Sequence, residues 1–114
     1  MNLPVEIPIH LHQRAISLDH LGVDEVAWTR DDVFEIIRAL EQTRVAILGG
    51  DVLQKFGTHP THNYDSWHTD RKEREAWLEY AARSRQATRA YVNAYPNPQA
   101  GSITFVLVFS SESD

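Results

Sequence analysis

Histidine and aspartate side chains gather in one polar stretch near the middle of the chain. Within twelve consecutive residues, His59, His62 and His68 supply imidazoles, and Asp65 and Asp70 supply carboxylates. These groups are common metal ligands, so the stretch is the candidate metal site of the sequence. It has no His-Glu-x-x-His pattern, and loops rich in His and Asp are usually just solvated. We therefore expect no metal and no cofactor, and we keep a small metal-dependent hydrolase using His59, His62, His68 and Asp65 as an alternative function.

The chain offers no nucleophile in the surroundings that would activate it. Cysteine is absent, there is no Gly-x-Ser-x-Gly elbow, and Gly49 and Gly50 lack the lysine and the spacing of a phosphate-binding loop. Asp51 invites a catalytic role, but aspartate at a turn commonly accepts backbone N–H bonds, and we expect that role here. We predict no catalytic residue and no enzymatic activity.

The glycine pair lies between two short apolar runs, which predicts a β-hairpin. The primed two-residue turns that match strand twist need positive φ, and glycine supplies it without steric cost. With Gly49 and Gly50 as the turn, residues 45–48 pair with residues 51–54, and Asp51 stands at a rigid acidic corner. Lys55 then falls on an edge strand, where lysine discourages pairing with other chains.

Two segments carry the sequence features of helices. Thr29 as an N-cap, with Asp31 and Asp32 in the first turn, predicts a helix over residues 30–43. We expect its buried stripe to contain Val33, Phe34, Ile37 and Leu40.

The second helix is longer. The capping-box spacing of Asp70 and Glu73 predicts a helix over residues 71–94. Residues at helical spacing define its inner face: Trp77, Tyr80, Ala81, Ser84, Thr88, Tyr91 and Tyr95. We expect its arginines, including Arg83, Arg85 and Arg89, to form a solvated face.

The remaining segments are simpler. Residues 3–9 alternate apolar residues with prolines and polar residues, which predicts an extended arm or an edge strand. Residues 57–69 are polar and predict a loop. Residues 103–109 are apolar at nearly every position and predict a buried strand.

These elements follow one another as helix, strand, strand, helix, strand, which indicates an α+β fold. We expect a small, mostly antiparallel sheet of three to four strands packed by two main helices, with the strands in the order second, first, third. Residues 1–114 are predicted to form a single domain, with an extended N-terminal arm over 1–10 and the α+β domain over 11–110.

Composition narrows the choice of partners and location. The net charge is −5, and phosphate repels an acidic protein, so we expect no nucleic-acid partner. No apolar run approaches the length of a membrane span, and the first residues do not suggest export. The absence of cysteine favours a reducing compartment, and we predict a cytoplasmic protein.

Several motifs together resemble a known family. The quoted residues are Ser17 to Thr29 (SLDHLGVDEVAWT), Val45 to Val52 (VAILGGDV) and Tyr64 to Trp67 (YDSW) before a charged helix. They are similar to the immunity protein 40 family of bacterial polymorphic toxin systems over roughly residues 15–110. The Gly-Gly-Asp corner, followed at this distance by Tyr-Asp-x-Trp, is the most specific part.

The resemblance implies a small α+β protein that binds and neutralises a cognate toxin and has no catalysis of its own. We take Asp51, Tyr64, Asp65 and Trp67 as candidate toxin contacts, while Gly49, Gly50 and Asp51 form the structural part of the motif. Trp67 either packs on the core or anchors an interface. A homodimeric structural module, associating through the sheet face that the helices leave uncovered, is a further alternative.

Overall fold

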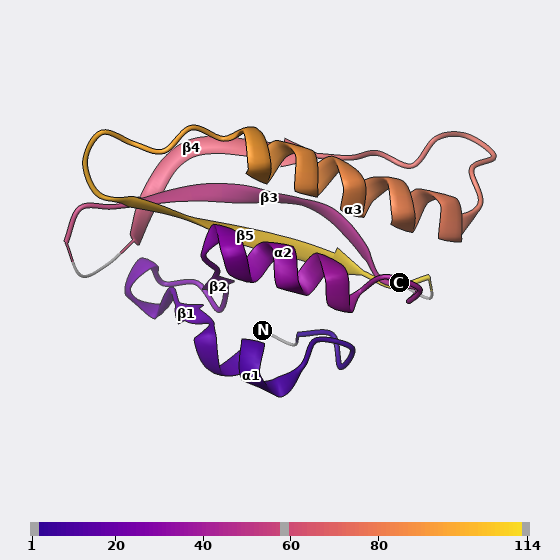
Figure 1. Cartoon of the computed structure of the whole chain (residues 1–114), viewed down its shortest axis with the longest axis horizontal. Helices are drawn as coiled ribbons and strands as arrows, with labels where there is room; N and C mark the ends of the chain where they lie inside the picture. Colours follow the sequence, from indigo (N-terminus) through magenta and orange to yellow (C-terminus); the bar gives the residue numbers. More distant parts are fainter. Residues whose placement is uncertain (1–2, 58–59, 113–114) are drawn as a thin grey trace.

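The computed structural model describes residues 3–57 and 60–112 and combines helices with two antiparallel sheets (Figure 1). The elements in chain order are α1 (Ile9–Arg14), β1 (Ile16–Ser17), the 3₁₀ turn η1 (Asp19–Leu21), β2 (Val26–Ala27), α2 (Arg30–Ala39), β3 (Ala46–Lys55), β4 (Pro60–His68), α3 (Trp77–Ala94) and β5 (Ser102–Ser110). The α+β prediction is therefore confirmed. None of the described helices combines the length and the apolar character needed to cross a membrane.

The main sheet has the strand order β4-β3-β5, and both strand pairs are antiparallel. The predicted order of second, first, third strand does not hold, because the two strands predicted on either side of Gly49 and Gly50 are both parts of β3, and the neighbour at that edge is β4. The antiparallel pairing predicted for the last strand beside the first is confirmed by the pairing of β5 with β3. Just after β2, Trp28 adds a bridge at the outer edge of β5, where its backbone exchanges two hydrogen bonds of 2.8 Å with Phe105. The three-stranded sheet is thus extended locally by a fourth segment.

The predicted hairpin turn at Gly49 and Gly50 is wrong. Both glycines lie inside the continuous central strand β3, and neither has a positive φ. Gly50 pairs with Trp67 on one side and Leu107 on the other. Lys55 accordingly ends the central strand, between Pro60 and Ser102, and does not lie on an edge strand as predicted.

The polar segment predicted as a loop forms the edge strand β4 over residues 60–68. Only β3 pairs with β4 in the sheet, so the other edge of β4 faces solvent. Its polar composition is compatible with this position. Its register against β3 shifts between Asp51 and Leu53, where the segment from His62 to Ser66 bulges. The sequence did not predict this strand because Trp67 is the main apolar residue that the segment contributes to the core.

The two main helices are present, but their ends differ from the prediction. Thr29 caps α2 as predicted by accepting a hydrogen bond from the Asp32 amide, whereas the helix ends at Ala39. α3 starts at Trp77, well after the predicted start, because Arg74 has a positive φ of 64° that interrupts a right-handed helix. The expected cap at Asp70 and Glu73 does not form there.

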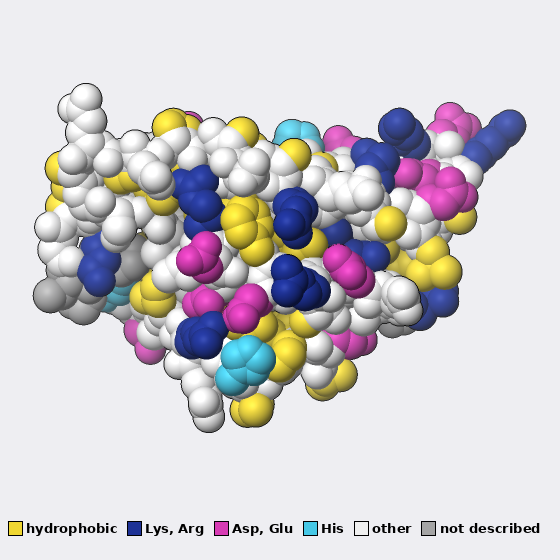
Figure 2. Space-filling view, in the orientation of Figure 1, with side chains coloured by type: hydrophobic (Ala, Val, Ile, Leu, Met, Phe, Trp, Pro, Cys, Tyr) yellow, Lys and Arg dark blue, Asp and Glu magenta, His cyan; other side chains and the backbone are white. Residues whose placement is uncertain are grey.

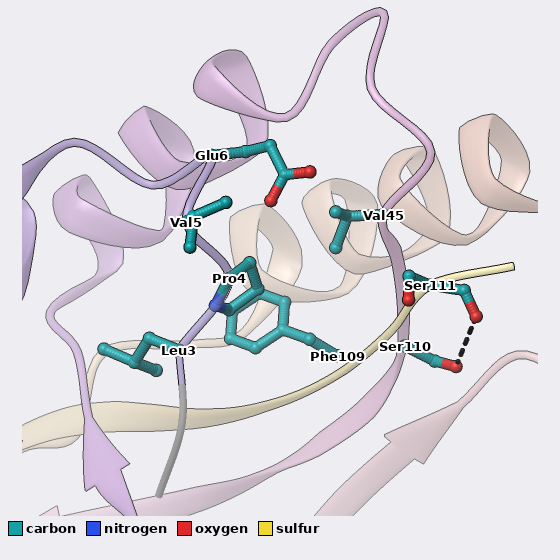
Figure 3. A pocket seen from close by; sticks show the side chains of 8 residues that line it. All are labelled: Leu3, Pro4, Val5, Glu6, Val45, Phe109, Ser110 and Ser111. Carbon is teal, nitrogen blue, oxygen red and sulfur yellow. Dashed lines mark hydrogen bonds between the residues drawn. The ribbon is translucent and has the colours of Figure 1, made fainter. Parts of the chain in front are cut away.

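The N-terminal segment is not an extended strand. The Ile7 amide donates to the Pro4 carbonyl in a turn, and α1 begins at Ile9. Ile7 and Leu11 are almost completely buried and belong to the main core. Residues 3–6 line a hollow of about 350 Å³ against Val45 and Phe109 (Figure 3), so this segment packs on the body of the protein.

The helices and the short β1–β2 sheet cover different parts of the main sheet. α3 packs on β3, α2 packs on β5, and the two helices contact each other (Figure 1). On the opposite face, Leu53 and Val106 are buried beneath Leu18 and Ala27. The half of that face near Gly49 has no such cover among the described residues.

Candidate functional site

Gly49 and Gly50 are required by close packing between strands. A Cβ on Gly50 would collide with the Val106 carbonyl oxygen and would lie 2.5 Å from Cη2 of the Trp67 ring. A Cβ on Gly49 would collide with the Trp67 carbonyl oxygen and lie 2.9 Å from the Cα of His68. Glycine is needed at both positions because the neighbouring strand leaves no room for a side chain.

The Trp67 side chain lies beneath α3 and is only 9% exposed. Its Nε1 donates to Thr88 Oγ1 at 3.1 Å, and its ring stacks on Tyr91 with 4.7 Å between centroids. Phe105 adds an edge-to-face contact at 6.3 Å. Of the two roles considered for this residue, the structure shows the packing role.

Asp51 lies on the opposite face of the sheet from Trp67. Gly50 and Trp67 are directly paired, and successive residues of a strand point to opposite faces, so Asp51 and its partner Ser66 point away from the helices. Within the described part of the chain, no group donates a hydrogen bond to the Asp51 carboxylate. The residue is half-buried in a strand, so the expected turn-stabilising role does not apply.

A shallow groove of about 290 Å³ lies where the two quoted motif segments meet. Its floor is the bare backbone at Gly49, and its walls include the exposed Val108. The lining residues are Leu48, Gly49, Gly50, Asp51, Ser66, Trp67, His68 and Val108. We call this the open-face groove.

Asp65 is held on the helix side of the sheet. The Tyr95 hydroxyl donates to Asp65 Oδ2 at 2.5 Å and accepts from Asn63 Nδ2 at 2.7 Å. Burial, together with the hydrogen bond to Asp65, raises the pKa of Tyr95. The backbone of Tyr64 lies between these two residues in the bulge of β4. The structure therefore brings Asp51 near β4 without placing it on the same face as Asp65.

The candidate metal ligands do not form a cluster in the described residues. His59 lies outside them, and His62 pairs with Leu53 in the β3–β4 ladder. His68 is exposed, with its Nε2 3.8 Å from Asp70 Oδ2. Among residues 3–57 and 60–112, no three His, Asp or Glu side chains converge as the ligands of a metal ion do.

The open-face groove offers contacts of mixed character. Val108 supplies apolar surface, Ser66 and His68 supply exposed polar groups, and Asp51 supplies a carboxylate. Sequence reasoning missed Ser66, His68 and Val108 as neighbours, because β4 was predicted as a loop. In β4 and β5 these residues alternate with buried ones. If residues 60–68 had been predicted as a strand, this alternation would have placed the three side chains on one face of the sheet.

Comparison with known proteins identifies the family. The model of the family described as Immunity protein 40 matches residues 17–109, which is most of the chain. No curated protein and no solved structure matches the chain. The matched range includes the central strand, the open-face groove and α3. The chain therefore belongs to the immunity protein 40 family.

Proposed function

We propose that this protein is a cytoplasmic immunity protein of a bacterial polymorphic toxin system, and that it neutralises a cognate toxin by binding it at the open-face groove. Membership of the family implies a toxin as the partner. The observation that carries the choice of surface is that the Gly49–Asp51 segment borders one groove together with Ser66 and Trp67. Ser66 and Trp67 are the last two residues of the Tyr64–Trp67 motif that the resemblance singled out.

The groove has the composition of an interface centre. Val108 is 39% exposed, whereas Leu53 and Val106 on the same sheet face are buried beneath Leu18 and Ala27. An apolar patch with a polar rim favours association, because a partner that covers it removes apolar surface from water. Asp51 at the rim has no hydrogen-bond donor among the described residues, so its carboxylate is available to a basic or amide group of the toxin.

The earlier candidates take different parts in this proposal. We expect Asp51 to contact the toxin directly and Tyr64 to extend the contact along the bulged edge strand. Asp65, which Tyr95 holds on the helix side of the sheet, lies outside this surface. Trp67 contributes indirectly, from the helix side of the sheet. Its ring packs against Gly50, and this contact stabilises the β3–β4 register that shapes the groove. A standard interface buries about 800 Å² on each partner, so the groove is the centre of a larger contact.

Co-expression with the toxin encoded beside this gene tests the function. The protein should abolish toxin-dependent killing and should form a complex with the purified toxin domain. Killing that continues unchanged in the presence of the folded protein would overturn the proposal. Light scattering of the protein alone separates this function from the homodimer alternative, since dimerisation through the groove would compete with toxin binding.

A pair of matched substitutions tests the surface. Val108→Glu places a charge in the groove, whereas Leu78→Glu makes the same kind of change at a residue of α3 that is 52% exposed and remote from it. For a residue at an interface centre, we expect Val108→Glu to weaken toxin binding at least about tenfold, and Leu78→Glu to leave it within about twofold. Equal affinities for the two variants would exclude the open-face groove.

A further inference from the structure

Arg85 on α3 carries a buried charge that forms no ion pair with any described carboxylate. It is only 8% exposed, contrary to the solvated position predicted for it. Its Nη1 donates to the Val45 carbonyl at 2.7 Å, at the start of the central strand. None of the described carboxylates lies within ion-pair distance of its guanidinium. Burial lowers the pKa of Arg85, and the negative charge of nearby Glu41 partly opposes that shift.

The free N–H groups of Arg85 open onto a groove between α2 and α3. None of its nitrogens is both enclosed and without a hydrogen-bond partner, and the residue lines a hollow of about 440 Å³. The lining residues are Ile37, Arg38, Glu41, Gln42, Ala82, Arg85, Gln86 and Arg89. We call this the helix-face groove. Figure 2 shows basic side chains, with acidic ones beside them, on the face of the molecule that carries the two helices.

The other two arginines of the groove are exposed, and neither forms an ion pair with an acidic side chain in the part of the chain that the structure describes. Arg89 is held with its guanidinium carbon 5.3 Å from the Phe34 ring centroid, which fixes its direction. Arg38 forms no ion pair with a described residue. Glu41 is the single carboxylate in the lining, so three positive charges face one negative charge. The local charge is positive although the chain carries a net charge of −5.

This arrangement favours an incoming anion. Burial of a charge is costly unless the charge is paired, and a guanidinium presents paired N–H donors that match a carboxylate. A carboxylate entering the groove would gain hydrogen bonds from Arg85 and Coulomb attraction from Arg38 and Arg89. Arg85 already loses most of its hydration when the protein folds. A bound carboxylate would therefore add favourable interactions with Arg85 at little further desolvation cost.

We infer that the helix-face groove binds an acidic side chain of a polypeptide partner. The groove is larger than a single carboxylate requires, and the amides of Gln42 and Gln86 are available to pair with peptide groups beside it. A nucleic acid is disfavoured by the negative charge of the whole chain. The inference does not depend on the immunity function, because the site lies on the opposite side of the sheet from the open-face groove.

The probe is a short, blocked, glutamate-rich peptide titrated into the isotope-labelled full chain at low salt, with amide chemical shifts as the readout. Binding should shift the amides around Arg85 and Gln86 and should weaken as salt is added. The matched peptide with glutamine in place of glutamate should bind at least about tenfold more weakly, and so should acetate, which tests a small anion.

Two variants with exposed substitutions complete the test. The double variant Arg38→Gln/Arg89→Gln should lose at least about tenfold in affinity, while Arg74→Gln, the same change at an exposed arginine outside the groove, should stay within about twofold. No shift with the glutamate peptide, equal binding of the glutamine peptide or acetate, or equal affinities of the two variants would each overturn the inference. The peptide titration does not measure toxin protection. A failure of this inference can therefore be told apart from a failure of the proposed immunity function.

Discussion

Replacing Gly50 with alanine tests whether this glycine serves strand packing. The added methyl group must displace both the Val106 carbonyl oxygen and the Trp67 ring. Overpacking costs about 1–3 kcal/mol, and weakening the buried hydrogen bond from the indole to Thr88 adds about 1 kcal/mol. Alanine regains about 0.5–1 kcal/mol over glycine within a strand. The net loss of unfolding free energy should be about 1–3 kcal/mol.

Urea unfolding followed by far-ultraviolet circular dichroism measures this change, and Gly57→Ala is the matched control. A Cβ at Gly57 meets nothing within 4 Å, and its φ is not in the left-handed region. We expect that variant to stay within about 0.5 kcal/mol of the original protein. Equal unfolding midpoints for the two alanine variants would refute the close-packing argument.

A double-mutant cycle identifies the contact responsible. Trp67→Phe removes the part of the indole that faces Gly50, so the cost of Gly50→Ala should fall by about 1 kcal/mol or more in that background. Residues that do not touch show additive effects. Additivity would therefore refute the Trp67 contact even if Gly50→Ala alone were destabilising.

Three further changes have defined outcomes. Thr29→Ala removes the cap of α2 and should lower the unfolding free energy by about 1 kcal/mol in urea unfolding, whereas Thr29→Ser should retain most of it. Thr88→Val leaves the buried Trp67 indole N–H without its acceptor and should cost about 1–3 kcal/mol by the same assay. The hydrogen bond from Arg83 lowers the pKa of Glu75 from 4.5 to about 2, so the stabilisation from this carboxylate is present above pH 4.5 and is lost as the pH falls toward 2. Acid unfolding of Glu75→Gln should show a shallower loss of stability in that window, and an unchanged pH profile would contradict the pairing.

Local signals in the sequence predicted the elements whose structure is locally determined. Thr29 followed by Asp31 and Asp32 is sufficient to start a helix, and it does so. The apolar run at 103–109 needs no partner to be identified as a strand, and β5 spans it.

Predictions failed where a distant residue decides the local structure. Glycine suits both a tight turn and a close approach between strands, and only the position of Trp67 across the ladder distinguishes the two. The start of α3 depends on the left-handed φ of Arg74, which nothing in the composition of that segment reveals. Arg85 has the pattern of a surface residue, but the Val45 carbonyl at the start of β3 draws it inward.

The glycine pair links the core of this protein to the surface that we propose for toxin binding. Because Gly50 has no side chain, the Trp67 ring lies directly over the central strand and joins the core beneath α3. Because Gly49 has none, the opposite face is bare backbone between Val108 and His68. Side chains at these positions would remove both features together.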